Sequence, residues 1–281
     1  MDWSKAKSIL IVALIFTNVL LGYVLFIDAN RVDATLEKGF IDKTVKLLDE
    51  RDIKLSTDIP LTNENLNGLT VEYETYNSQD LNKDFFNNKG SIKLKSEGLL
   101  DIEYNDELIT LINNKLLIYE SKSKDEIYNI QTDEQAYEVA LNFLHEKNIP
   151  LSDMNLTFLK KVDGIYNLEF TKIYGESYLE STFTNIMLDN RGVLKLERTW
   201  LNTIEAGEKA IEISSAPKSL LALISMEEVY GKTIKDISLC YYFNPEKHEY
   251  LEDPSEAKRG RTIPAWRIQF EDGYKVFIDN Y

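Results

Sequence analysis

The sequence is poor in the residue types on which thiol and metal chemistry depend. Its 281 residues include one cysteine, Cys240, and two histidines, His145 and His248. A lone cysteine can form neither an intramolecular disulfide nor a cysteine-based zinc site, and two histidines leave little material for a histidine-rich metal centre. We therefore expect no metal and no cofactor. Because Cys240 lies in the apolar segment 237–243, the sequence predicts a buried structural thiol rather than a nucleophile.

Sequence motifs of the common catalytic sites are also missing. The chain has no G-x-S-x-G nucleophile elbow, no phosphate-binding glycine loop, no H-E-x-x-H and no D-x-D-x-D-G calcium loop. Adjacent acidic residues such as Glu227 and Glu228 are expected by chance among 47 acidic residues, so they do not indicate a glycosidase pair. We predict that the protein is not an enzyme.

Basic residues are scarce relative to acidic ones. The chain has 32 lysines and arginines against 47 acidic residues, which gives a formal net charge of −15. Nucleic-acid binding needs a basic surface, so we expect no nucleic-acid partner. At 43% hydrophobic and 28% charged residues, the composition is that of a folded chain with a real core.

One apolar run dominates the N-terminal region. Residues 9–27 carry no formal charge, and at ~1.5 Å per residue they span most of a ~30 Å hydrocarbon layer. We therefore predict a cytoplasmic tail (1–8) and a transmembrane helix (9–27). Lys5 and Lys7 precede the helix, so the positive-inside rule predicts a single-pass cell-membrane protein with its bulk outside the cell. A signal peptide cleaved near Ala34 is the alternative that stays open.

Small and polar residues interrupt the apolar run. Asn18 and Gly22 are four residues apart and share one helix face, and Ala13 and Thr17 share a neighbouring one. Helices in lipid associate through small residues and through polar side chains that hydrogen-bond across the interface. These four residues are therefore candidate contacts to a partner membrane helix. The alternative is that a single-span anchor simply tolerates one asparagine and one glycine.

The segment 28–130 is expected to hold a juxtamembrane helix and a first α+β domain. Apolar residues at helical spacing predict a helix from about Phe40 to Asp52. From about Leu66 to Ser121 the pattern changes to the alternation of strands, with Asn113 and Asn114 as a two-residue hairpin turn.

The segment 131–281 is expected to form a second α+β domain from two similar units, 131–205 and 213–281. The first begins with a capping box from Thr132 to Gln135, and the second with a cap at Ser215 and Pro217 in the first helical turn. In each unit the helix is followed by strands and an acidic turn that ends in glycine, residues 189–192 in the first unit and 271–273 in the second. We predict an α+β fold of helix-on-antiparallel-sheet modules, and their matched spacing predicts that the modules are duplicates of one another.

Two short segments resemble a known family. The opening Met1-Asp-Trp-Ser-Lys-Ala-Lys7 before a single apolar span, and the late Ile263-Pro-Ala-Trp-Arg-Ile268 before a closing strand, resemble the YycH/YycI family. These proteins regulate the WalK/WalR (YycG/YycF) two-component system, and their modules look like PepSY domains.

The resemblance implies a non-enzymatic regulator with two partners. These are a WalK/YycG-like sensor histidine kinase that controls cell-wall metabolism, and a YycH-like sister regulator. The resemblance supplies no catalytic residues, and it implies that the anchor, residues 9–27, is the kinase-contact helix. The alternatives are a ligand-sensing module that binds cell-wall fragments, or a wall-associated chaperone or enzyme.

Overall fold

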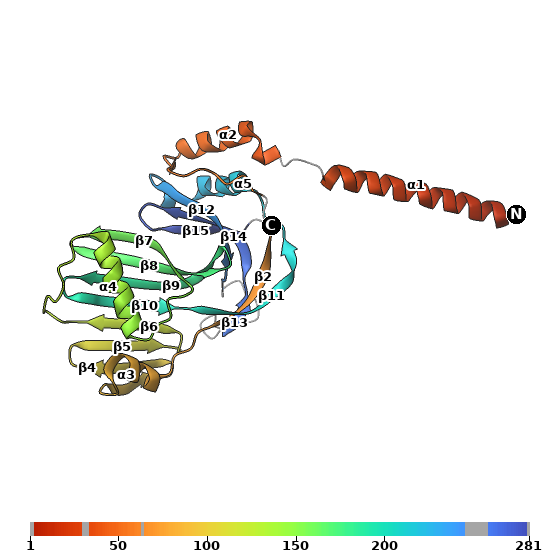
Figure 1. The fold of residues 1–281 in the computed structure, drawn as a ribbon. Helices are drawn as coiled ribbons and strands as arrows, with labels where there is room; N and C mark the ends of the chain where they lie inside the picture. The colour runs from red at the N-terminus through yellow and green to blue at the C-terminus, as the bar shows by residue number, and fades with distance from the viewer. Residues whose placement is uncertain (1–2, 30–33, 63–64, 245–257, 280–281) are drawn as a thin grey trace.

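The fold is α+β, with one N-terminal apolar helix and a large sheet that is mostly antiparallel (Figure 1). The computed structural model describes residues 3–29, 34–62, 65–244 and 258–279. The helices within these ranges are α1 (Trp3–Ala29), α2 (Lys38–Asp49), α3 (Ser78–Phe86), α4 (Asp133–Glu146) and α5 (Ala216–Leu220), with the 3-10 segments η1 (Ala34–Leu36), η2 (Leu221–Ser225) and η3 (Glu227–Val229).

Two sheets are built from the described strands. The first has 12 strands in the order β15-β14-β12-β9-β10-β6-β5-β4-β3, with β1 paired to β12 and with β7 and β8 joined through β9. Its strands are β1 (Lys54–Leu55), β3 (Ser91–Ser96), β4 (Leu99–Tyr104), β5 (Glu107–Ile112), β6 (Leu116–Ser121), β7 (Met154–Val162), β8 (Ile165–Tyr174), β9 (Ser177–Asp189), β10 (Gly192–Thr199), β12 (Thr233–Tyr242), β14 (Ile263–Phe270) and β15 (Lys275–Ile278). The second has three strands in the order β11-β2-β13, namely β2 (Leu66–Tyr73), β11 (Leu201–Ile211) and β13 (Arg259–Arg261).

Local sequence signals produce several of the element ends as expected. Asn113 and Asn114 have φ values of 50° and 57°, which confirms the predicted hairpin turn with both central residues left-handed. The capping box is confirmed, because the Gln135 amide donates to Thr132 Oγ1 at 3.3 Å. Ser215 is the N-cap residue of α5 and Pro217 lies in the first turn, as predicted, but the Ser215 side chain makes no cap bond and is instead hydrogen-bonded to Thr35.

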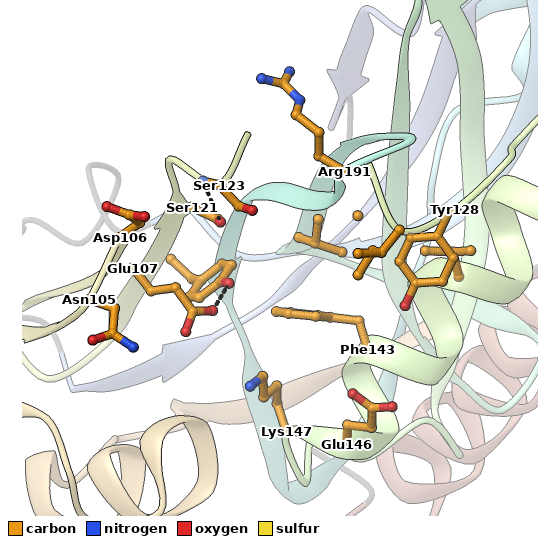
Figure 2. A pocket seen from close by; sticks show the side chains of 15 residues that line it. Asn105, Asp106, Glu107, Ser121, Ser123, Tyr128, Phe143, Glu146, Lys147 and Arg191 are labelled. Atoms are coloured by element: carbon orange, nitrogen blue, oxygen red, sulfur yellow. Dashed lines mark hydrogen bonds between the residues drawn. The ribbon is translucent and has the colours of Figure 1, made fainter. Parts of the chain in front are cut away.

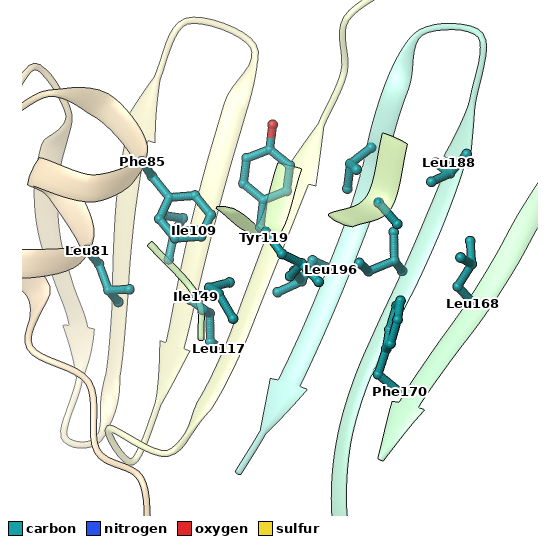
Figure 3. Close-up of a cluster of buried hydrophobic side chains, with 14 of the residues drawn as sticks. Leu81, Phe85, Ile109, Leu117, Tyr119, Ile149, Leu168, Phe170, Leu188 and Leu196 are labelled. Carbon is teal, nitrogen blue, oxygen red and sulfur yellow. The ribbon is translucent and has the colours of Figure 1, made fainter. Parts of the chain in front are cut away.

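The first hydrophobic core lies between α3 and α4 and one face of the large sheet (Figure 3). Phe85 of α3 and Ala140 of α4 pack above strand residues such as Leu117 and Leu196, all of them buried. The strands β6 and β10 pair directly, so this core crosses the domain boundary expected at residues 130 and 131. Residues 99–121 and 133–199 therefore form one packed unit.

The second core lies between α2, α5 and strands β12, β14 and β15. Leu48 of α2 is fully buried with Leu220 of α5 and Phe270 of β14. Much of the helical cover of the unit 213–281 thus comes from α2, because α5 is only five residues long. The helix that follows the apolar anchor is part of the body and not a linker.

Strand β9 joins the two cores. Residues 183–189 of β9 pair with β10, whereas residues 178–180 pair in parallel with β12. The same edge of β9 therefore pairs with two different strands, and the sheet divides between them. Ser181 lies at the division with a φ of 73°, a backbone conformation that is costly for a residue with a side chain. The sequence pattern predicts only the C-terminal half of this strand, from Phe183 to Leu188.

A buried ionic cluster fixes the two halves to each other. Arg267 of β14 is 1% exposed, and its Nε donates to Glu180 Oε1 of β9 at 2.6 Å. Lys275 of β15 forms ion pairs with Glu180 and with Glu169 of β8. The neighbouring Trp266 points to the other face of β14 and donates its Nε1–H to the Ser214 carbonyl at 2.7 Å.

A second buried arginine lies at the far end of the first core. Arg198 of β10 is 1% exposed; it donates to Glu74 Oε2 at 2.9 Å and to Thr184 Oγ1 at 2.8 Å. Its guanidinium carbon also lies 4.1 Å from the ring centroid of Trp200. Since Glu74 directly follows β2, this arginine ties the small sheet to the large one.

Truncation of the Arg267 side chain should destabilise the body strongly. In an Arg267→Ala variant, the carboxylate of Glu180, 3% exposed, loses its closest partner and stays buried. We expect a loss of roughly 3–5 kcal/mol in the free energy of unfolding, measured by denaturant titration. The exposed Arg259 gives the control, since Arg259→Ala should change stability by less than about 0.5 kcal/mol. Equal losses in the two variants would contradict the role given to the cluster.

Candidate functional site

Between Lys7 and Val24, helix α1 is not buried by any other part of the described structure. The stretch Lys7–Val24 is long and apolar enough to span a membrane, and none of it is buried in the structure. It extends away from the body in Figure 1. A core helix of the same composition would be covered by other elements, so α1 has an apolar surface that water does not favour.

The four residues singled out in the anchor all lie exposed on α1, and they divide into two pairs. At about 100° per residue, the centre of the pair Ala13 and Thr17 is about 140° from the centre of the pair Asn18 and Gly22. The pairs therefore face nearly opposite directions, and the expectation that they lie on neighbouring faces is wrong. One partner helix cannot contact both pairs.

The polar groups of the two pairs differ in what they can offer a partner. Thr17 Oγ1 donates to the Ala13 carbonyl at 2.8 Å, so this hydroxyl is engaged within its own helix. Within the described part of the chain Asn18 has no hydrogen-bonding partner for its amide. A Cβ added at Gly22 would meet nothing within 4 Å, which leaves the backbone open to close approach.

The body contains a cleft that the sequence pattern does not predict. It has a volume of about 370 Å³ and lies between the C-terminal half of α4, the β4–β5 turn and the β9–β10 turn (Figure 2). Its apolar side comes from Tyr128, Val139 and Phe143. Its charged edge comes from Asp106, Glu107, Glu146, Lys147 and Arg191. This size and this mixture of walls are typical of a site that binds a small molecule or a side chain.

Tyr119 forms the base of the cleft and is held rigidly. It is 3% exposed, and its hydroxyl donates to Glu107 Oε1. Burial, and secondly the bond to Glu107, raises the pKa of Tyr119 well above its usual value, so the phenol keeps its proton. Lys147 donates to the Phe85 carbonyl at 3.1 Å. Tyr119, Glu107 and Lys147 thus each have a partner within the protein, which leaves the apolar wall and the exposed carboxylates open.

The β9–β10 turn forms one rim of the cleft and holds the segment before α4. Arg191 Nη2 lies 2.6 Å from Asp189 Oδ2, and the Arg191 amide donates to Asp189 Oδ1 at 2.8 Å. Between them, Asn190 accepts through its side chain from the Ile130 amide at 2.9 Å. Gly192 has a φ of 100°, which confirms the turn that the glycine predicts.

Two further candidate groups, Cys240 and His145, do not line the cleft. Cys240 is fully buried in β12, which confirms the predicted structural thiol, and burial raises its pKa well above its usual value. His145 is exposed near the end of α4, and His248 lies outside the described residues. In the ranges that the structure covers, no three His, Cys, Asp or Glu residues are grouped so that they could hold a metal ion.

Comparison with known proteins yields a likeness in fold. No family model and no curated protein matches the sequence. An uncharacterized protein from Eubacterium rectale has a similar structure, with a TM-score of 0.52 and 13% identity over 85% of this chain and 96% of that one. The C-terminal domain of YpeB from Bacillus megaterium aligns with a TM-score of 0.42 and 10% identity over 74% of this chain and 94% of that one. The first likeness supports the α+β class, and the YycH/YycI resemblance stays a prediction.

The ion pair in the β9–β10 turn should make stability depend on acid pH. The hydrogen bond from Arg191 lowers the pKa of Asp189 below its ordinary 3.8, so folding favours the ionised carboxylate. This stabilisation is present above pH 3.8 and is lost as the pH falls below it toward the folded-state pKa. We expect Asp189→Asn to lower the melting temperature at pH 7, and the difference from wild type to shrink below pH 3.8. A difference that is constant from pH 7 to pH 3 would contradict this assignment.

Proposed function

We propose that the protein is a membrane-anchored extracytoplasmic regulator that binds and modulates a sensor histidine kinase of the WalK/YycG type, which controls cell-wall metabolism. The observation that carries the proposal is the unburied apolar surface of α1 ahead of a folded body. Lys5 and Lys7 favour a cytoplasmic N-terminus and an extracellular body. The YycH/YycI resemblance supports the same role and PepSY-like modules, and the matched spacing of the units 131–205 and 213–281 supports a duplication.

The two faces of α1 fit a helix that has a neighbour on each side. We assign Asn18 and Gly22 to one partner span, because an amide and an open backbone suit a close, hydrogen-bonded contact. Ala13 and Thr17 then face a second span about 140° away. A kinase and a YycH-like sister regulator would supply these two spans.

Regulation would act through the connection between anchor and body. Helix α2 follows α1 closely, and its buried Thr44 and Leu48 are seated against α5 and the second core. A displacement of the anchor would therefore displace side chains of the second core and, through the bond between Arg267 and Glu180, those of the first core. A partner biases the two signalling states of a kinase only by binding them unequally, so both the anchor and the body are assigned state-dependent contacts.

Removal of the one unengaged amide in the anchor tests this proposal. We expect Asn18→Leu to reduce co-purification with the kinase about threefold or more, because an interhelical hydrogen bond is lost while the anchor stays apolar. Val12→Leu, an exposed apolar exchange on the same helix, is the matched control. Retention of the complex by the Asn18 variant, or a mature chain that lacks residues 1–33, would overturn the proposal.

The cleft favours a second candidate function, a module that senses cell-wall fragments. Its apolar wall and acidic edge could hold a short peptide with a charged side chain. Solubilised wall peptides should then raise the melting temperature, by an amount that corresponds to about 2.7 kcal/mol at a ligand concentration of 100 Kd. Tyr128→Ser, which removes an exposed part of the wall, should abolish that shift. No shift at millimolar peptide would exclude this function.

A further inference from the structure

Strand β3 ends the large sheet and leaves one edge open. It is the last strand in the sheet order and pairs with β4 alone, and no strand within the described ranges pairs with its other edge. All six of its residues are exposed. An open edge displays backbone N–H and C=O groups that can pair with a further strand.

The two faces of β3 differ in chemistry. Ile92 and Leu94 lie opposite Ile102 and Leu100, on the face that α3 covers, yet they are 39% and 76% exposed. The apolar face of the first core therefore continues to the edge of the sheet without cover.

On the other face of β3, lysines alternate with these residues. Lys93 is paired with Glu103, and Lys95 Nζ lies 3.2 Å from Asp101 Oδ2, both on β4. Each ammonium has three N–H donors, so it can also donate to a second carboxylate that approaches from the open side. In a chain of net charge −15, the edge between residues 89 and 96 carries three lysines and no acidic residue.

We propose that the open edge of β3 binds an extended segment of a partner protein in which acidic and aliphatic residues alternate. The backbone of the segment would add a strand to the sheet. Its aliphatic side chains would cover Ile92 and Leu94, and its carboxylates would meet Lys93 and Lys95 from the side opposite β4. The inference rests on the proposed function in that it assumes a protein partner for the body.

The same chemistry argues against a second copy of this chain as the occupant. Suppose that two β3 strands pair antiparallel about the middle of the strand, with their apolar side chains on the same face. Lys93 of one copy then lies opposite Lys93 or Lys95 of the other copy. Like charges directly opposite each other destabilise a sheet. Lysines on an edge also discourage pairing of identical edges, so the edge selects for an acidic segment.

The test uses the full-length protein in lipid nanodiscs and a labelled probe peptide. The probe is a capped seven-residue peptide, Thr-Glu-Val-Glu-Val-Glu-Thr, and its counterpart has lysine in place of each glutamate. We expect the glutamate peptide to bind in fluorescence anisotropy and to slow amide hydrogen exchange in residues 91–96. The lysine peptide should bind at least tenfold more weakly.

Charge reversal on β3 locates the binding. The double variant Lys93→Glu/Lys95→Glu should weaken the glutamate peptide about tenfold or more and favour the lysine peptide. Lys122→Glu/Lys124→Glu, two exposed positions after β6, changes the net charge equally and is the matched control. If the reversed variant unfolds, Lys93→Gln/Lys95→Gln replaces it, with a smaller loss expected.

Three results would overturn the inference: no binding of either peptide, equal binding of both, or protection confined to another strand. Absence of binding would mean that the lysines only keep the edge unpaired. Co-purification of the wild-type protein with the kinase separates this failure from failure of the proposed function. If the kinase is retained while the peptide does not bind, only the edge inference fails. If the peptide binds while no kinase is retained, only the proposed function fails.

Discussion

The arrangement of the body depends on the burial of one guanidinium. Arg267 is enclosed between strands of both halves, and a buried charge is tolerated only when it is paired and hydrogen-bonded. Glu180 has to be beside it, so β9 must run far enough to lie alongside β12 before it turns to pair with β10. The left-handed backbone at Ser181 is the local strain that this path contains. Hydrophobic burial drives each core, while the ionic cluster sets their relative position.

Short-range signals predicted much of the local structure, because they depend on neighbouring residues alone. The capping box at Thr132, the Asn113–Asn114 turn and the turn at Gly192 each occur where the sequence places them. Helix α3 was missed: it is short, and its start depends on Asn77, whose side chain accepts from the Gln79 amide at 2.8 Å. Strand β11 was missed because most of its residues are exposed, so the alternation that marks a half-buried strand is absent.

The anchor and the cleft show the two limits of inference from sequence. The anchor is continuous, so its apolar composition is sufficient to find it. The cleft is lined by the β4–β5 turn, β6, the segment before α4, α4 itself and the β9–β10 turn, which the chain separates widely. A periodic pattern within one segment does not show that distant segments lie side by side in the fold. Likewise, the exposure of Leu94 follows from the place of β3 in the strand order, which a pattern of alternating residues does not contain.

Because α2 packs on the second core, proteolysis between α1 and the body has two distinct outcomes. A cut ahead of Lys38 would separate the body from α1 with Leu48 still in place. A cut after Asp49 would strip the cover from Leu220 and its neighbours, so the released product would expose core surface and be a substrate for further degradation. A protease would therefore either release an intact body or start its degradation, depending on which side of one three-turn helix it cuts.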